Sequence, residues 1–189
     1  PGKAREYRQL LARPGLTLRF PAELGLHGDV PEDGGSYAAN AAQKALAYSR
    51  LSGLLTLADD SGLEVDALDG APGIYSARYA PGDDHDRVTA LLSHLRDVPW
   101  EQRTARFRCV IVVADPADGP LAQAEGVCEG RIAFAPAGEG GFGYDPVFYL
   151  EEYGCTLAQL SEAEKNRISH RGRAVAALRA HWDALAALE

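Results

Sequence analysis

Two adjacent carboxylates are the residues of this sequence best suited to chemistry. Asp59 and Asp60 lie in the run Ala-Asp-Asp-Ser-Gly at 58–62, directly after the apolar stretch 54–57. Acids at the end of a buried strand are typical of α/β enzymes, whose ligands bind in the crevice beyond the sheet. One carboxylate can bind Mg²⁺, which often comes with substrate phosphates, and the other can support the metal or activate water. An acidic turn capped by Asp60 would explain the same residues, since Asp is a common turn residue.

Lysine is scarce, which makes each lysine position informative. The chain has 19 Lys and Arg residues, of which only Lys3, Lys44 and Lys165 are lysines. An ammonium group is a compact point charge that suits phosphate oxygens, whereas Arg presents a planar fork. Lys3 also opens a helical pattern, where backbone N–H groups favour anions. Genome composition explains the excess of arginine equally well, and the three lysines would then be surface residues.

Three other segments could form walls of a ligand site. Residues 140–146 read Gly-Gly-Phe-Gly-Tyr-Asp-Pro; the glycines allow close backbone approach and the two aromatic rings can stack on a flat ligand. The loop 32–35, Glu-Asp-Gly-Gly, supplies carboxylates, and the segment 169–172, Ser-His-Arg-Gly, supplies cations. Taken singly, each of the three also suits an ordinary surface loop or turn.

Alternating helices and strands must position these residues. The patterns predict helices over 3–13, 36–52, 83–96 and 169–188, and strands over 16–20, 56–60, 63–67, 104–114 and 121–135. Ser36 can cap the second helix, and the run Ser-Glu-Ala-Glu at 161–164 is a capping box. The acidic pair would then lie in a turn between two short strands. This alternation predicts an α/β fold.

Composition narrows the class of protein. With 189 residues, 46% hydrophobic and 24% charged, the chain suits a globular domain. A net charge of −8 argues against a nucleic-acid binder, and no apolar run reaches the roughly 18 residues of a membrane helix. Neither a disulfide framework nor a zinc site fits Cys109, Cys128 and Cys155, so a reducing compartment, the cytoplasm, is expected.

The start of the chain suggests a missing element. The sequence opens directly in a helical pattern, whereas an α/β domain usually places a strand before its first helix, and it contains no Met. We therefore expect a first strand and the beginning of the first loop to precede Pro1. Processing at a Met-Pro start is the alternative.

Six segments occur together and in order. They are 1–3, 32–40, 58–62, 70–79, 140–146 and 169–172. With them, the chain resembles the inosine triphosphate pyrophosphatase family over essentially its whole length, as one domain spanning 1–189. The resemblance implies an elongated, two-lobed α/β fold around a long mixed β-sheet with flanking helices, with the active site in the cleft between the lobes. It also implies Mg²⁺-dependent hydrolysis of ITP, dITP or XTP to the monophosphate and pyrophosphate, by a homodimer.

The resemblance also implies a role for each matching residue. Asp60 would bind the metal and orient or deprotonate the attacking water, with Asp59 beside it, and Glu32 would help to bind the metal. Lys3 and Lys44 would contact the phosphates. The other expected substrate contacts are Ser61, the wall formed by Phe142, Gly143, Tyr144 and Asp145, and the opposite wall formed by Lys165, His170 and Arg171.

The purine 6-position would decide specificity. Donors of the turn at His170 and Arg171 would pair with a 6-keto oxygen and would face the 6-amino group of adenine unfavourably. An unpaired buried polar group costs about 1–3 kcal/mol, which is enough to reject ATP.

Two departures from the family pattern stand out. The Thr-Gly-Asn that normally begins the family's first loop is absent, and Ala39 replaces a frequent Glu before Asn40. Two other functions remain open: a related pyrophosphatase for other modified nucleotides, such as modified pyrimidine triphosphates, and a catalytically silent nucleotide-binding protein. The intact set of Glu32, Asp60 and lysines favours an enzyme.

Overall fold

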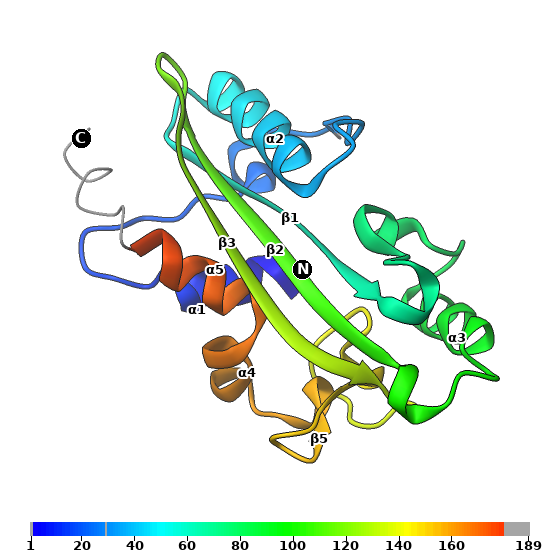
Figure 1. Ribbon diagram of the computed structural model, residues 1–189. Helices are drawn as coiled ribbons and strands as arrows, with labels where there is room; N and C mark the ends of the chain where they lie inside the picture. Colours follow the sequence, from blue (N-terminus) through cyan, green and yellow to red (C-terminus); the bar gives the residue numbers. More distant parts are fainter. Residues whose placement is uncertain (1, 29, 180–189) are drawn as a thin grey trace.

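A long antiparallel hairpin forms the axis of the molecule. The computed structural model describes residues 2–28 and 30–179. Its sheet has the order β1-β2-β3-β4-β5, and Figure 1 shows β2 and β3 running along the whole structure. The strands are β1 (Thr56–Val65), β2 (Thr104–Asp115), β3 (Gly119–Ile132), β4 (Phe148–Leu150) and β5 (Cys155–Thr156).

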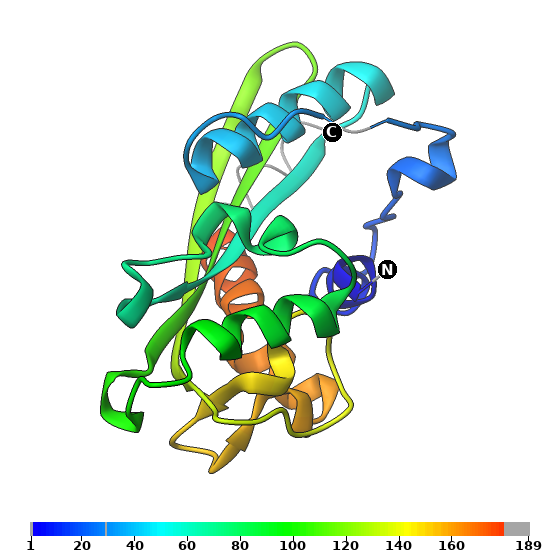
Figure 2. The same ribbon diagram turned by 90° about the vertical axis from the view of Figure 1, so that its right-hand side faces the viewer.

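Helices cover both faces of the long strands. The helices are α1 (Gly2–Leu10), α2 (Tyr37–Ser52), α3 (Asp84–His94), α4 (Glu162–Ile168) and α5 (His170–Arg179). Helices α1 and α5 pack on the face of β2 that carries Cys109 and Ile111, whereas α2 packs on the face that carries Val112. Figure 2 shows α2 and α5 on opposite sides of the strands. None of the helices within the described ranges is long and apolar enough to cross a membrane.

The core is divided along the axis, which gives two lobes. In one lobe Val88 and Leu91 of α3, with Leu95 just after the helix, share a core cluster with Phe107 and Phe148. In the other lobe α1, α2 and α5 pack around the opposite half of the hairpin. The elongated two-lobed α/β fold with flanking helices is thereby confirmed.

The predicted caps are present. The Ser36 side chain accepts a hydrogen bond from Ala39 N at the start of α2, and Ser161 and Glu164 form the capping box of α4. The final helix is described only to Arg179, so the predicted stretch 180–188 lies outside the described residues.

The acidic turn was predicted wrongly. β1 runs without interruption from Thr56 to Val65 and pairs Asp59 with Ile111 and Asp60 with Val110. Gly62 is therefore a strand residue, and it is required because a Cβ there would lie 2.2 Å from Gly73 O. The close approach of 73–78, and not a turn, explains this glycine.

Two further expectations about the sheet differ from the structure. Segment 16–20 is not a strand; Leu16, Leu18 and Phe20 pack against the core, but the segment pairs with no strand of the described chain. All strand pairings in the described part are antiparallel, whereas a mixed sheet was expected.

Candidate functional site

The two acids of β1 lie on opposite faces of the sheet, because side chains alternate along a strand. Asp60 faces α2, where Asn40 Nδ2 donates to its Oδ2 at 3.0 Å. Asp59 faces α1 and α5, where Lys3 Nζ lies 3.1 Å from its Oδ2. Both carboxyl side chains are only 8% exposed. The pair therefore belongs to two different clusters of charged residues.

The cluster on the α2 side joins Glu32 to Asp60 through Lys44. Lys44 Nζ lies 2.7 Å from Glu32 Oε1 and 3.3 Å from Asp60 Oδ1. Arg78 Nη2 donates to the backbone oxygen of Glu32 at 3.2 Å. Burial acts to raise the pKa of Glu32, but the hydrogen bond and charge of Lys44, helped by Lys3 and Arg78, lower it overall. We call Glu32, Lys44 and Asp60 the carboxylate–lysine cluster.

Asn40 fixes the geometry of this cluster. The residue is fully buried, and its Oδ1 accepts a hydrogen bond from Gly34 N at 2.9 Å while its Nδ2 donates to Asp60. Asn40 thus ties the acidic loop to β1. It lies one helical turn before Lys44 on α2, so both side chains share a face. Ala39 also lies under this loop, since a Cβ at Gly34 would be 2.6 Å from the Ala39 Cβ.

The other face carries a chain of alternating charges, which is buried except at its first member, Lys3. Lys165 Nζ lies 2.7 Å from Glu6 Oε1 and 2.5 Å from Asp145 Oδ2. Arg171 pairs with the other oxygen of Glu6, and its Nε lies 3.6 Å from Asp59 Oδ2. In order, this charge network is Lys3, Asp59, Arg171, Glu6, Lys165 and Asp145.

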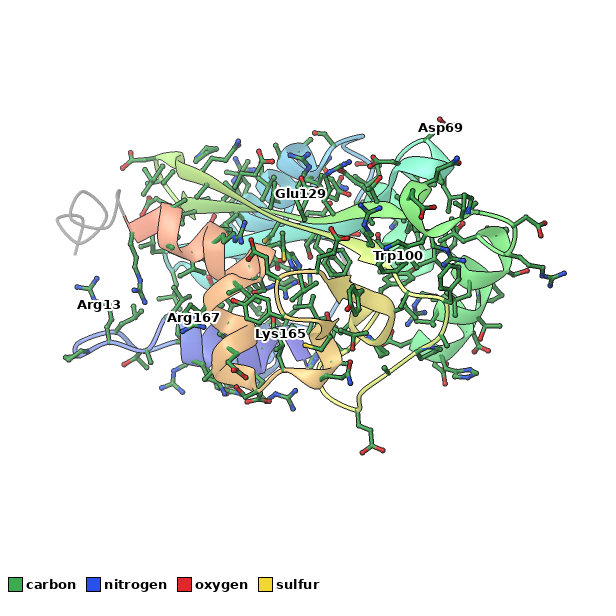
Figure 3. All side chains as sticks on the ribbon, turned by 60° about the horizontal axis from the view of Figure 1, so that its bottom comes forward. Arg13, Asp69, Trp100, Glu129, Lys165 and Arg167 are labelled. Atoms are coloured by element: carbon green, nitrogen blue, oxygen red, sulfur yellow. The ribbon has the colours of Figure 1, made fainter. Side chains whose placement is uncertain are left out.

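Alternation of sign is what makes this burial tolerable, because a lone buried charge costs several kcal/mol. Arg171 is 1% exposed and Lys165 5%; Figure 3 labels Lys165, a residue of α4. Burial acts to raise the pKa of Asp59, yet Lys3 and Arg171 hold it well below its usual range. Burial dominates at Asp145, so its pKa is raised despite Lys165.

The glycine-rich segment 140–146 lies against this network. The Phe142 ring is close to two cations: its centroid lies 4.8 Å from Lys165 Nζ and 5.6 Å from Arg171 Cζ. Asp145 Oδ2 accepts a hydrogen bond from Phe142 N at 2.8 Å. The start of α1 touches the same ring, since a Cβ at Gly2 would be 2.5 Å from Phe142 Cδ1.

Two contacts, one from α3 and one from the segment Gly73–Arg78, hold the same segment. Gly143 N donates to Asp84 Oδ2 at 2.7 Å, and the Tyr144 hydroxyl donates to Ser76 O at 2.9 Å. Tyr144 is 4% exposed and belongs to the core. Of the two aromatic residues expected in the wall, Phe142 is thus the one beside the charge network.

Ser61 and His170 complete the predicted set. Ser61 Oγ accepts a hydrogen bond from Arg171 Nη2 at 3.0 Å. The His170 ring stacks on Phe107 with centroids 4.7 Å apart, and its Nδ1 has no hydrogen-bond partner among the residues that the structure describes. Burial, with the positive charges of Arg171 and Lys165, holds the pKa of His170 well below its usual value.

His170 makes stability depend on pH. In the unfolded chain it binds a proton near pH 6.5, whereas in the folded protein it stays neutral, so acid favours unfolding. Between pH 7.5 and 5.5 we expect the free energy of unfolding to fall by about 1 kcal/mol more for wild type than for His170→Asn. Urea unfolding at three pH values measures this difference, and His85→Asn, at an exposed position, is the control. Equal slopes for wild type and His170→Asn would contradict it.

A cavity of about 850 Å³ also reaches the site. It lies between α1, the segment 13–26 and β1, and Lys3 and Asp59 contribute to its lining. The rest of the lining is mainly apolar, including Leu11 and Leu16. Arg13, Arg19 and Asp115 are the other charged residues of the lining, so its charges are not confined to Lys3 and Asp59.

Sequence reasoning missed four residues of the site. Asn40 joins Gly34 to Asp60, and Glu6 links Lys165 to Arg171. Arg78 contacts Glu32, and Asp84 holds Gly143. Asn40 and Arg78 lie in the motif segments 32–40 and 70–79, which could have indicated them. Helical spacing could have indicated Glu6, because it lies three residues after Lys3 and so on the same helix face. Asp84 becomes a neighbour of the site only through tertiary folding, and we find no local signal for it.

Fold and site together define an α/β protein in which carboxylates pair with lysines on both faces of β1. The comparisons with known proteins agree: the model of the Ham1 family matches residues 1–181. The chain belongs to the Ham1 family.

Relatives and solved structures match most of the chain. The dITP/XTP pyrophosphatase of Desulforamulus reducens is 53% identical over 92% of this chain and 87% of its own length. That of Geobacillus kaustophilus is 50% identical over 96% and 90%. The HAM1 protein of Coxiella burnetii superposes with a TM-score of 0.83 at 40% identity, covering 96% of this chain and 93% of that one. The Staphylococcus aureus Ham1 protein gives 0.85 at 38% identity, covering 97% and 94%.

Proposed function

We infer that this protein hydrolyses the non-standard purine nucleoside triphosphates dITP, XTP and ITP to the monophosphate and pyrophosphate. The observation that carries this is the carboxylate–lysine cluster, in which Lys44 Nζ contacts both Glu32 and Asp60. The sequence of the chain is also about half identical to those of relatives named dITP/XTP pyrophosphatase, which supports the same reaction. Removal of such nucleotides cleanses the pool from which nucleic acids are made.

Mg²⁺ is the cofactor that we propose, and the donor set fits it. One oxygen of Glu32 and one of Asp60 already converge on a single cation, the Lys44 ammonium, and Mg²⁺ prefers such carboxylate oxygens. Bound there, the metal would neutralise charge on the phosphates. Asp59 faces the other side of β1 with Lys3 and Arg171, so we assign it to the charge network and the metal to Glu32 and Asp60.

The protein's own groups would then position the reaction. Pyrophosphate leaves when water attacks the α-phosphorus, and such transfers depend mainly on positioning and electrostatic stabilisation. Asp60 is the carboxylate that would orient the attacking water and accept its proton. Lys44 and Lys3 lie on either side of β1 and would each contact phosphate oxygens. Ser61 follows Asp60 and completes the contacts from this strand.

We propose that the purine is held between Phe142 and the start of α5. Lys165 and Arg171 are engaged by carboxylates, so their part is to hold Phe142 and the turn in place. The first backbone N–H groups of a helix lack intrahelical partners, and those at the start of α5 would donate to a 6-keto oxygen, together with His170. The 6-amino group of adenine is itself a hydrogen-bond donor and would find no acceptor there, so adenine would be rejected.

The substrate class is tested by pyrophosphate release with Mg²⁺ from dITP, XTP, ITP, GTP, ATP and a modified pyrimidine triphosphate. We expect kcat/KM for dITP and XTP to exceed that for ATP by at least about 10²-fold, because a site that hydrogen-bonds its substrate discriminates strongly. Preference for the modified pyrimidine would favour the related pyrophosphatase, and no turnover at all would favour a silent binding protein.

We also propose a cytoplasmic homodimer that binds neither nucleic acid nor membranes. All three cysteines are free, which suits a reducing compartment. The net charge of −8 disfavours nucleic acid as a partner. Light scattering of the purified protein tests the homodimer.

The lysines at the site should not tolerate arginine. Lys3→Arg and Lys44→Arg keep the charge but replace a compact ammonium by a planar fork, and we expect each to lower kcat/KM for dITP at least about tenfold, since small misplacements are costly. Lys165→Arg should also lose activity, because Lys165 fits between Glu6 and Asp145. Arg96→Lys, at an exposed position, is the control. Three variants with wild-type activity would refute the special role of lysine.

A further inference from the structure

Lys44 lies where a metal would have to bind. Its Nζ is 2.7 Å from Glu32 Oε1 and 3.3 Å from Asp60 Oδ1, and its side chain is only 15% exposed. The other oxygen of each carboxylate has a different neighbour. Asp60 Oδ2 accepts from Asn40 Nδ2 at 3.0 Å, and Glu32 Oε2 lies 3.5 Å from Arg78 Nη1. The two oxygens that face Lys44 are therefore those left for a cation.

An ammonium group and a divalent cation cannot share this position. Mg²⁺ binds oxygen at about 2.0–2.1 Å, which is closer than the present contacts of Lys44 Nζ, and two positive charges at that separation repel strongly. Lys44 must therefore give up at least one carboxylate oxygen when the metal binds. Its flexible four-carbon stem allows the ammonium to swing away from α2 without a change in the backbone.

We propose that the Lys44 ammonium occupies the metal position in the free protein, where it neutralises Glu32 and Asp60. When metal and nucleotide bind, the ammonium moves to the phosphates. The inference rests on the proposed function, since it concerns the same cluster. Free metal then binds weakly, because it must displace Lys44. Nucleotide phosphates give the displaced ammonium a new partner, so metal and nucleotide favour each other's binding, and this coupling is reciprocal.

The test is titration of the intact protein with Mg²⁺ by calorimetry in the absence of nucleotide. Lys44→Met removes the ammonium and keeps a side chain of similar length, and we expect it to bind Mg²⁺ about tenfold more tightly than wild type, because the competing charge is gone. Lys44→Arg retains the charge and should not tighten binding. Arg96→Met is the control, since Arg96 lies at an exposed position outside the cluster; we expect a change of less than about threefold.

A second titration measures the coupling. With a non-hydrolysable α,β-methylene analogue of dITP present, wild type should bind Mg²⁺ at least about tenfold more tightly than without it, and Lys44→Met should show a smaller gain. Circular dichroism verifies that each variant is folded.

Several results would overturn the proposal. They are Mg²⁺ binding to Lys44→Met no tighter than to wild type, equal tightening in Arg96→Met, and no measurable binding to either wild type or Lys44→Met. The titration without nucleotide is independent of turnover. If Lys44→Met binds Mg²⁺ more tightly than wild type, but wild type releases no pyrophosphate, the proposed function fails and the competition between Lys44 and the metal is still supported.

Discussion

Asp60→Asn should abolish turnover and leave the fold intact. Asp60 Oδ1 faces Lys44 and the proposed metal position, so the amide removes a metal ligand and the group that prepares the water. We expect kcat for dITP to fall by about 10⁴-fold or more, at or beyond the upper end for loss of a general base alone. The fold should persist because an Asn oxygen can still accept the hydrogen bond that Asn40 now donates. Single-turnover kinetics with saturating Mg²⁺ measure the loss.

Asp66→Asn is the matched control for this change. Asp66 follows β1, and its carboxylate is 45% exposed and paired with Arg106. Turnover of this variant should stay within about twofold of wild type, as for other surface substitutions. Turnover of Asp60→Asn within about tenfold of wild type would contradict the assigned mechanism.

Arg171→Ala should cost the largest amount of stability at the site. The guanidinium is 1% exposed and pairs with Glu6 and Asp59. Its removal breaks the network at its centre, leaving Glu6 with Lys165 and Asp59 with Lys3 as their remaining cationic partners. Breaking such a pair costs about 3–5 kcal/mol in the free energy of unfolding. Urea unfolding at pH 7.5 measures the loss.

The neighbouring arginine supplies the control for this second change. Arg173 is exposed and donates one hydrogen bond, to Val127 O at 2.9 Å, so Arg173→Ala should cost about 1 kcal/mol. A loss below about 1 kcal/mol for Arg171→Ala would mean that the charge network does not depend on it.

The resemblance to the family predicted the two-lobed fold, and local capping residues predicted where two helices begin. Ser36 and the capping box at Ser161 acted locally, so sequence alone placed the starts of α2 and α4. The acidic pair shows where local reasoning stopped. A strand was expected to end at Asp60, because Asp is a common turn residue. Had the alternation been continued to Val65, Asp59 and Asp60 would have fallen on opposite faces.

Long-range contacts set the remainder of the site. Glu6 meets Lys165 and Arg171 across more than 150 positions of sequence, an ion-paired arrangement that no local pattern specifies. The stacking of the His170 ring on Phe107 likewise joins residues far apart in the sequence. Both results arise because α5 packs over the hairpin and brings its first turn against α1.

Analysis of the products from dITP tests the central claim most directly. The purified protein, incubated with dITP and Mg²⁺, should form deoxyinosine monophosphate and pyrophosphate in equal amounts, as resolved by ion-exchange chromatography without added phosphatase. Asp60→Asn should form neither. Deoxyinosine diphosphate with orthophosphate would show attack at the γ-phosphorus, and that result, or no product from wild type, would contradict the account.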